Sequence, residues 1–372
     1  MTRIKWNWQQ DNWPNFTYDK EVLRGLELDF IQSSAMALGA LKHVSHHEKD
    51  LLVVEVLSDE AMKTSEIEGE YLDRDSIQES IKKNLGLATE KRKLPAAEFG
   101  ISEMMVNLYQ TFDDQLTDNY LFEWHSMLTN GRRDLTDIGR YRTHKEPMQI
   151  VSGARIDSKR VHYEAPPSDI VPKEMHAYMD WYNRLHFNAN EKDSILAKSG
   201  VAHFYFLAIH PFEDGNGRIA RGLSEKSLSM SLGRPALISL SQMIQSNKKM
   251  YYDVLEAHNR KLDLTQWLLY FGKTIIDAQE NTLKIIEFLI QKAKFFDRFA
   301  SQMNQRQITV VRRILKEGHH GFKGGLSAEN YTRIAKTSAS TATRDLKDLV
   351  DKRILNKTGV LKSTRYFLNL KI

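Results

Sequence analysis

The stretch "IHPFEDGNGRIAR", residues 209–221, decides the fold of this chain. Pro211 cannot continue a helix and restricts the residue before it, so the preceding apolar helix is predicted to end at His210. Gly215 and Gly217 let the backbone approach a ligand closely, and consecutive N–H groups in such a loop form a concave anion site. A second helix is predicted to start near Gly217, with the positive end of its dipole at the loop.

The charged side chains of this stretch add to the anion site. Arg218 and Arg221 are three residues apart, so they share one helix face and can give bidentate charge to phosphate oxygens. Asp214 is a hard oxygen ligand, placed where a Mg²⁺ ion bridging phosphates would need one. His210 can take a proton from a hydroxyl at neutral pH. The stretch therefore predicts a phosphate site with a base beside it, suited to phosphoryl or nucleotidyl transfer.

The segment resembles the Fic motif, written HPFx(D/E)GNGRxxR, and matches it at every fixed position. The resemblance implies a helical Fic core that transfers AMP from ATP to a Ser, Thr or Tyr hydroxyl of a target protein, with Mg²⁺ as cofactor. It also implies roles for the motif residues. These are His210 as catalytic base, Asp214 as the Mg²⁺ carboxylate, Asn216 and Gly217 in the anion hole, Arg218 on the α- and β-phosphates, Arg221 on the γ-phosphate, and Glu213 and Gly215 among the nucleotide contacts.

Two further stretches are similar to parts of the same family. "EPMQIVSG" takes the place of the Fic flap, which pairs with an extended segment of the target by β-augmentation. The flap residues expected to dock the target are Met148, Gln149, Ile150, Val151 and Ser152. "KMYYDVLEAHN" is similar to the helix that lines the adenosine pocket, which makes Tyr252 and Asn259 candidates there. Ordinary helix packing is the alternative for these two residues.

An upstream segment, "KTSEIEGE", fits the pattern (S/T)xxxE(G/N) through Thr64, Glu68 and Gly69. In Fic proteins of the second class this motif is inhibitory, and the resemblance implies that Glu68 pairs with Arg221. A carboxylate in that position would take the partner of the γ-phosphate and repel ATP. The alternative is a plain helix end, since glycine commonly follows the last turn of a helix.

Apolar periodicity predicts a mainly α fold, with a β-hairpin flap in the core and a C-terminal winged helix. The predicted parts are residues 1–90, an N-terminal Fic-associated helical region with the inhibitory helix; 91–280, the catalytic core; 281–305, a helical linker; and 306–372, a winged helix-turn-helix. Residues 306–372 hold 15 basic and 5 acidic residues, whereas the rest of the chain holds 38 basic and 43 acidic residues. This basic end favours a polyanionic partner, either DNA at the third helix or, as the alternative, a protein.

Composition restricts the other classes. The chain has no cysteine, which excludes disulfides, thiolate nucleophiles and cysteine-ligated metals, and fits a reducing cytoplasm. It has no apolar run of signal-peptide or membrane-spanning length, so a cytoplasmic location without a membrane is expected. The sequence leaves a homodimer open. It also leaves open a nucleotide-sensing DNA-binding regulator, or a Fic enzyme that transfers another nucleotide or removes AMP.

Overall fold

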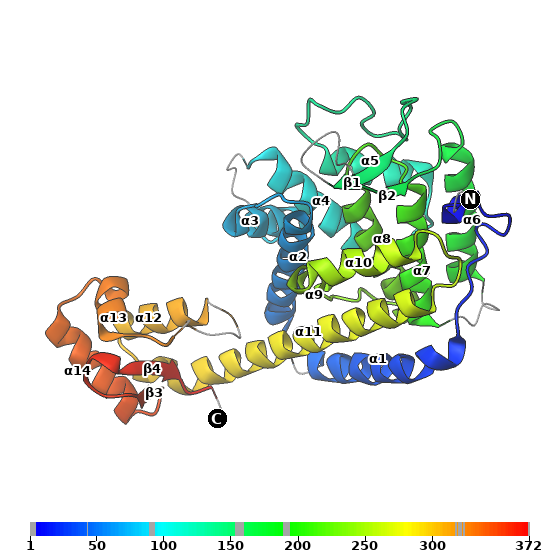
Figure 1. Cartoon of the computed structure of the whole chain (residues 1–372). Coiled ribbons are helices and arrows are strands. Elements are labelled where there is room, and N and C mark those ends of the chain that lie inside the picture. The colour runs from blue at the N-terminus through cyan, green and yellow to red at the C-terminus, as the bar shows by residue number, and fades with distance from the viewer. Residues whose placement is uncertain are drawn as a thin grey trace. The chain divides into compact units, whose positions relative to one another are not determined.

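The computed structural model is mainly helical, as the sequence predicts, with two small antiparallel hairpins (Figure 1). It describes residues 5–42, 44–88, 94–152, 160–188, 194–316, 318, 322 and 324–370. The helices of this described part are α1 (Lys20–Leu41), α2 (His46–Ile67), α3 (Arg74–Asn84), α4 (Ala96–Gln110), α5 (Asp118–Leu128), α6 (Val171–Phe187), α7 (Ile195–Ile209), α8 (Asn216–Leu232), α9 (Leu240–Ser246), α10 (Lys248–His258), α11 (Thr265–Phe299), α12 (Gln305–Leu315), α13 (Ala328–Ala335) and α14 (Ala339–Asp351). The strands are β1 (Gln149–Ser152), β2 (Arg160–Glu164), β3 (Leu355–Thr358) and β4 (Arg365–Leu368).

The chain forms two compact units, and their boundaries fall inside α1, α2 and α11. The first unit holds Met1–Ala35 and Val53–Thr282, and the second holds Met36–Leu52 and Leu283–Ile372. The four-part division expected from the sequence stays a prediction. None of the described helices combines the length and the apolarity that crossing a membrane requires.

The core of the first unit is built on α7 and α8, which pack closely against each other. The sequence of α7, "ILAKSGVAHFYFLAI", is apolar nearly all round, and the helix is correspondingly buried on almost every side. Where α8 passes α5, Gly222 provides the space, because a Cβ at this position would lie 3.0 Å from the Trp124 ring and 2.8 Å from Met104. This tight core fixes the two helices that carry the stretch 209–221.

The aromatic N-terminal segment packs on the same core. The Trp13 ring meets Tyr205 of α7 edge-on at 5.2 Å, and its indole N–H donates to Glu174 at 2.7 Å. Phe16 makes a similar edge contact with Phe204 at 5.8 Å. These rings therefore anchor the terminus to the body of the first unit, as aromatic clusters near chain ends commonly do.

The first hairpin, β1 with β2, covers the segment expected to form the flap. Gln149 pairs with Glu164, and a bulge follows between Ile150 and Val151. The side chains of Ile150 and Val151 are 43% and 42% exposed. The turn of the hairpin, including Gly153, lies outside the described residues. The edge strand β1 thus presents apolar side chains to solvent.

The second unit contains α12, α13, α14 and the hairpin of β3 and β4, in the order predicted for residues 306–372. A bridge between Leu326 and Tyr366 attaches the hairpin to the segment before α13. Its assignment as a winged helix remains a prediction. The core of this unit gathers apolar residues of the three helices and both strands, together with Phe288, Phe295 and Phe299 of α11.

Candidate active site

The loop between α7 and α8 is fixed by its own side chains. His210 ends α7 in the left-handed conformation (φ 52°, ψ 60°), and Gly215 precedes α8 with φ 81°. The Asn216 amide accepts a hydrogen bond from the Phe212 N–H (3.0 Å) and donates one to the Phe212 carbonyl (2.8 Å). Because both polar atoms of the amide bind loop backbone, Asn216 shapes the loop from within.

The imidazole of His210 is neutral at physiological pH. Burial, followed by the nearby Arg142 guanidinium, lowers its pKa from 6.5 to about 4. Its Nδ1 is buried and has no hydrogen-bond partner within the described chain. A neutral imidazole with an unpartnered ring nitrogen has the protonation state that a general base requires.

Asp214 lies four residues after His210 in the same loop and is ionised. Burial opposes its charge, but Arg218, the Gly215 N–H and Arg132 together lower its pKa. Its Oδ2 accepts from Arg132 at 2.6 Å and lies 3.7 Å from Arg218. Among the described residues no cluster of three or more His, Cys, Asp or Glu could hold a metal. One carboxylate with phosphate oxygens nevertheless fits Mg²⁺, which commonly binds in that way.

Arg221 is buried, and its Nε and Nη2 bind the segment that the sequence marks as inhibitory. Its Nε donates to Thr64 Oγ1 at 2.7 Å, and its Nη2 donates to the Thr64 carbonyl at 3.0 Å and to Glu68 Oε1 at 2.7 Å. Burial disfavours the charge on Arg221, but Glu68 and two nearby tyrosines outweigh it, so the pKa of Arg221 is raised. The arginine expected to bind the γ-phosphate therefore has a carboxylate partner in this structure.

The end of α2 fixes the position of Glu68. The Glu70 N–H donates to the Ser65 carbonyl (2.9 Å) and the Gly69 N–H to the Glu66 carbonyl (3.1 Å), the two bonds of a Schellman motif. Gly69 supplies the positive φ of 88° that this motif needs. The helix end with glycine, which was the alternative interpretation of this segment, therefore also orients Glu68 toward α8.

The Glu68 carboxylate lies directly against the first turn of α8. A Cβ on Gly217 would come within 2.2 Å of Glu68 Oε1, so a side chain at this position would have to displace the carboxylate. Arg218, on the same turn, donates to Glu70 at 2.7 Å, and its Nε is buried without a partner in the described chain. Two carboxylates from one segment therefore occupy the end of α8 where an anionic ligand would bind.

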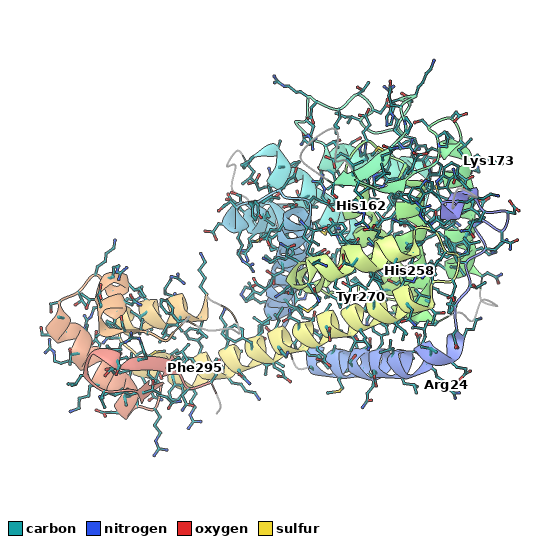
Figure 2. All side chains as sticks on the ribbon, in the orientation of Figure 1. Arg24, His162, Lys173, His258, Tyr270 and Phe295 are labelled. Carbon is teal, nitrogen blue, oxygen red and sulfur yellow. The ribbon has the colours of Figure 1, made fainter. Side chains whose placement is uncertain are left out.

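The candidates for the adenosine pocket lie in or just after α10. Tyr252 is 41% exposed, and burial of the rest of its side chain raises its pKa to about 12. The Asn259 amide donates to the carbonyl of His162 in β2, at 3.0 Å; Figure 2 labels His162. Asn259 thus holds the flap hairpin against the end of α10. The predicted role of both residues in adenosine binding stays a prediction.

Two arginines of the site, Arg132 and Arg142, were not anticipated from the sequence. Glu213, expected near the nucleotide, accepts hydrogen bonds from the N–H groups of Thr136 and Asp137, at 2.8 and 3.1 Å. It thereby fastens the loop that carries Arg132 and Arg142. The run "GRRDLTDIGRYR" holds both arginines, and its basic character was the available signal.

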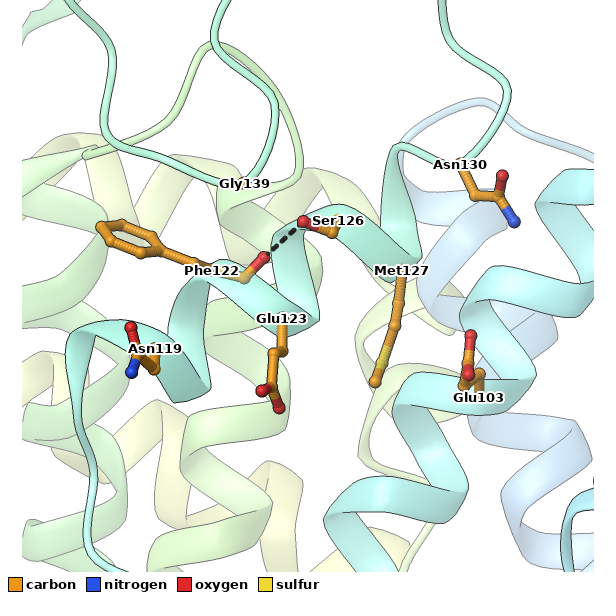
Figure 3. A pocket seen from close by; sticks show the side chains of 8 residues that line it. All are labelled: Glu103, Asn119, Phe122, Glu123, Ser126, Met127, Asn130 and Gly139. Atoms are coloured by element: carbon orange, nitrogen blue, oxygen red, sulfur yellow. Dashed lines mark hydrogen bonds between the residues drawn. The ribbon is translucent and has the colours of Figure 1, made fainter.

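A cavity of about 520 Å³ lies elsewhere on the first unit, at the surface of α4 and α5. Its lining consists of Glu103, Asn119, Phe122, Glu123, Ser126, Met127, Asn130 and Gly139 (Figure 3). None of the residues predicted from the sequence lines it. The candidate chemistry therefore lies at the α7–α8 loop and not in this cavity.

Comparison with known families finds two matches in the chain. Residues 115–228 match the Fic/DOC family, and residues 6–87 match a domain of unknown function, DUF4172. The stretch 209–221 lies inside the segment that matches the Fic/DOC family.

Similar proteins were found by sequence and by structure. Over 87 residues, the chain is 36% identical to proteins named protein adenylyltransferase Fic from Aedes aegypti and Culex quinquefasciatus. The match covers 23% of this chain and spans only 15% of each mosquito protein. A Fic family protein from Desulfovibrio desulfuricans has a similar structure (TM-score 0.54, 20% identity, 96% of this chain and 98% of that one). A Fic domain containing signaling protein from Bacteroides thetaiotaomicron is also similar (TM-score 0.51, 17% identity, 73% and 97%). These structures share the fold.

Proposed function

We propose that this chain is a Fic-type protein adenylyltransferase, which moves AMP from ATP to a Ser, Thr or Tyr hydroxyl of a target protein in the cytoplasm. The observation that carries the proposal is a neutral imidazole, His210, at the loop that leads into the arginine-bearing first turn of α8. The Fic domain over residues 115–228 and the partial similarity to adenylyltransferases support the same reaction.

In the proposed reaction His210 takes the proton of the acceptor hydroxyl. The oxygen forms a bond to the α-phosphorus, the bond from that phosphorus to the bridging oxygen breaks, and pyrophosphate leaves with the electron pair. Arg218 would hold the α- and β-phosphates and Arg221 the γ-phosphate. Asp214 would hold Mg²⁺, which when bound neutralises charge on the phosphate oxygens.

We propose that the contact between Glu68 and Arg221 inhibits the enzyme. The carboxylate and the γ-phosphate require the same guanidinium, and Thr64 holds that guanidinium toward α2 with a further hydrogen bond. A charge-assisted hydrogen bond of this kind contributes roughly 1.5–3 kcal/mol. Its loss corresponds to a rise in activity of roughly 10-fold to 100-fold.

Target docking would use the flap. The exposed strand β1, Gln149–Ser152, pairs with β2 on one side, the described residues add no strand on its other side, and Met148 precedes it. An extended segment of the target can add to such an edge, which would bring its hydroxyl toward His210.

The decisive experiment compares nucleotide transfer by the wild type, Glu68→Gly and Glu68→Gly with His210→Ala. Each protein is incubated with a mixture of nucleotides and its mass is measured. We expect an added AMP on the Glu68→Gly protein or its target and none on the double variant. The matched control is Glu66→Gly, which removes a carboxylate from the same helix end, where it pairs with Lys63 at 2.7 Å.

Other outcomes separate the alternatives. An unmodified Glu68→Gly protein would refute the transferase. A different added mass would identify another nucleotide as donor. If the wild type removes AMP from a modified protein and the Glu68→Gly variant does not, the reaction is AMP removal, with Glu68 orienting the water. If transfer activity is found only in the dimer fraction after size-exclusion chromatography, the homodimer is the active form.

A second candidate function, DNA binding by the C-terminal unit, is favoured by one observation on α14. Of its three acidic residues, Asp345 is buried and accepts from Arg306 (3.0 Å) and Tyr331 (2.9 Å), Asp348 is half-buried and pairs with Lys352, and only Asp351 is exposed. The exposed side of the helix carries Arg344 and Lys347. That side is therefore suited to a polyanion such as the major groove of DNA.

This second candidate is tested with a fluorescent DNA duplex. We expect binding that weakens steeply as salt rises, and a loss of about 10-fold or more in the double variant Arg344→Ala, Lys347→Ala. The control variant Lys82→Ala, Lys83→Ala removes the same charge from α3. Equal binding by both variants, or none by the wild type, would leave the unit as a protein-docking module.

A further inference from the structure

A guanidinium that belongs to none of the predicted roles lies beneath the catalytic loop. Arg142 is 1% exposed. Its Nε donates to the His210 carbonyl at 2.8 Å, and its Nη2 to the carbonyls of Pro166 (2.6 Å) and Ile209 (3.4 Å). Its Nη1 donates to the Ser168 hydroxyl at 2.8 Å.

These partners are unusual for a buried arginine. Within the described residues Arg142 forms no ion pair with a carboxylate, and its hydrogen-bond acceptors are three carbonyls and one hydroxyl. Burial lowers its pKa to about 10, so it remains charged at neutral pH. Two of the carbonyls end α7, where the helix dipole is negative and favours a cation.

The backbone that Arg142 holds is strained. His210 has a left-handed φ of 52°, which costs a non-glycine residue roughly 1–2 kcal/mol and persists only where its surroundings enforce it. Arg142 binds this turn at three successive carbonyls, because its own N–H also donates to Pro211 at 3.0 Å. One residue thus holds the left-handed turn that carries the imidazole.

The same guanidinium also holds the flap. Pro166 and Ser168 lie two and four residues after β2, and the Ser168 hydroxyl donates onward to the carbonyl of His144, five residues before β1. Arg142 therefore connects the base of the hairpin to the turn that carries His210. Acceptor and base need this fixed separation, since a misplacement of about 1 Å can cost roughly 100-fold in rate.

We propose that Arg142 is a positioning residue, which fixes the flap and His210 relative to each other for transfer to the acceptor hydroxyl. The role rests on the proposed transferase reaction. This role requires a guanidinium, because a lysine ammonium cannot bind the carbonyls at the end of α7 and the carbonyl of Pro166 in one plane. Arg142 also faces the imidazole as a positive charge, while Glu68 and Asp214 face it as negative charges.

The test uses Arg142→Ala and Arg142→Lys in the active Glu68→Gly protein. We expect kcat to fall about 100-fold in Arg142→Ala with the KM for ATP changed less than about 3-fold, and a partial loss in Arg142→Lys. Added guanidinium at millimolar concentration should restore part of the activity of Arg142→Ala. The matched control is Arg140→Ala, an exposed arginine of the same loop that pairs with Asp137.

A second measurement needs no nucleotide. Proton NMR of the His210 ring, assigned with His210→Ala, should show a higher pKa in Arg142→Ala than in the parent, because a positive charge has been removed. This shift is expected even if the transferase reaction itself proves wrong. Parental kcat with an unchanged ring titration in Arg142→Ala would overturn the proposal. If that variant does not fold, Arg142→Lys with parental kcat and titration overturns it.

Discussion

His210 is deprotonated at neutral pH because of where its backbone places it. Burial, followed by the positive charge of Arg142, lowers the pKa of its ring to about 4, below the ordinary 6.5. The neutral form, which can accept a proton, is therefore present above about pH 4. The pKa of Asp214, the candidate metal ligand, is also lowered, so this carboxylate is ionised over the same range.

We predict that kcat/KM of the Glu68→Gly protein stays level from pH 8 through pH 6.5 and declines only as pH falls toward 4. Removal of Glu68 takes away a negative charge that favours the protonated ring, so the decline should not move upward in pH. Initial rates of AMP transfer, measured after brief exposure to each pH, give the profile. A decline centred near pH 6.5 would show that the imidazole is not enclosed as described.

Residues that act through side-chain chemistry could be predicted, and those that act through backbone contacts could not. His210, Asp214 and Arg221 stand in a motif whose letters reflect their chemistry. Arg142 binds backbone carbonyls, which every residue has, so the sequence contains no pattern that pairs it with its partners. Thr64 and Glu68 contact Arg221, and Glu68 lies against Gly217, as the inhibitory pattern leads one to expect; the assigned roles of all the site residues remain to be tested.

At the scale of elements, the end of α2 controls where Glu68 lies. Gly69 has φ 88° and no neighbouring atom within 4 Å of an added Cβ, so alanine would fit the space but strain the backbone. We predict that Gly69→Ala weakens the inhibited arrangement by about 1 kcal/mol, which raises AMP transfer roughly 5-fold. Transfer rates and chemical denaturation of the variant measure the two effects.

Gly86 offers a matched control at the end of α3. It has φ 74°, equally open surroundings and the same Schellman bonds, with the Leu87 N–H donating to Lys82 at 2.8 Å. Gly86→Ala should lose similar stability and leave AMP transfer unchanged. Equal activation by both substitutions would mean that general loosening, and not the position of Glu68, relieves inhibition.

Helix ends with strong local signals could be predicted, whereas distant pairings could not. Pro211 marks the end of α7, and the structure ends that helix at Ile209 with His210 as its cap. The attachment of the flap to α10 depends on Asn259 donating to His162, across 97 residues of chain. Contacts of this kind arise from tertiary packing, for which single-sequence periodicity gives no signal.

For the whole molecule, the sequence predicts a mainly helical chain but not how its segments are shared between compact units. Residues 36–52 group with residues 283–372, although more than 200 residues separate them in the chain. Periodicity locates each helix but does not say which remote helix will cover its apolar face. All residues of the candidate active site lie in the first unit.

Nucleotide binding should therefore stabilise the first unit, by an amount that depends on Glu68. We predict that ATP with Mg²⁺ raises the Tm of the Glu68→Gly, His210→Ala protein, which can bind but not react, well above its effect on His210→Ala alone. At 100 times Kd the stabilisation is about 2.7 kcal/mol, or roughly 5–10 °C for a unit of this size. Differential scanning calorimetry at matched protein concentration measures it.

ADP distinguishes competition for Arg221 from a general change in the pocket. Glu68 occupies the guanidinium assigned to the γ-phosphate, which ADP lacks, so ADP should raise the Tm of both proteins by similar amounts. An ATP shift that is also equal in both would mean that Glu68 does not compete with the γ-phosphate. Where the two units unfold in separate transitions, only the transition of the first unit should move, since the second unit contributes no residue to the site.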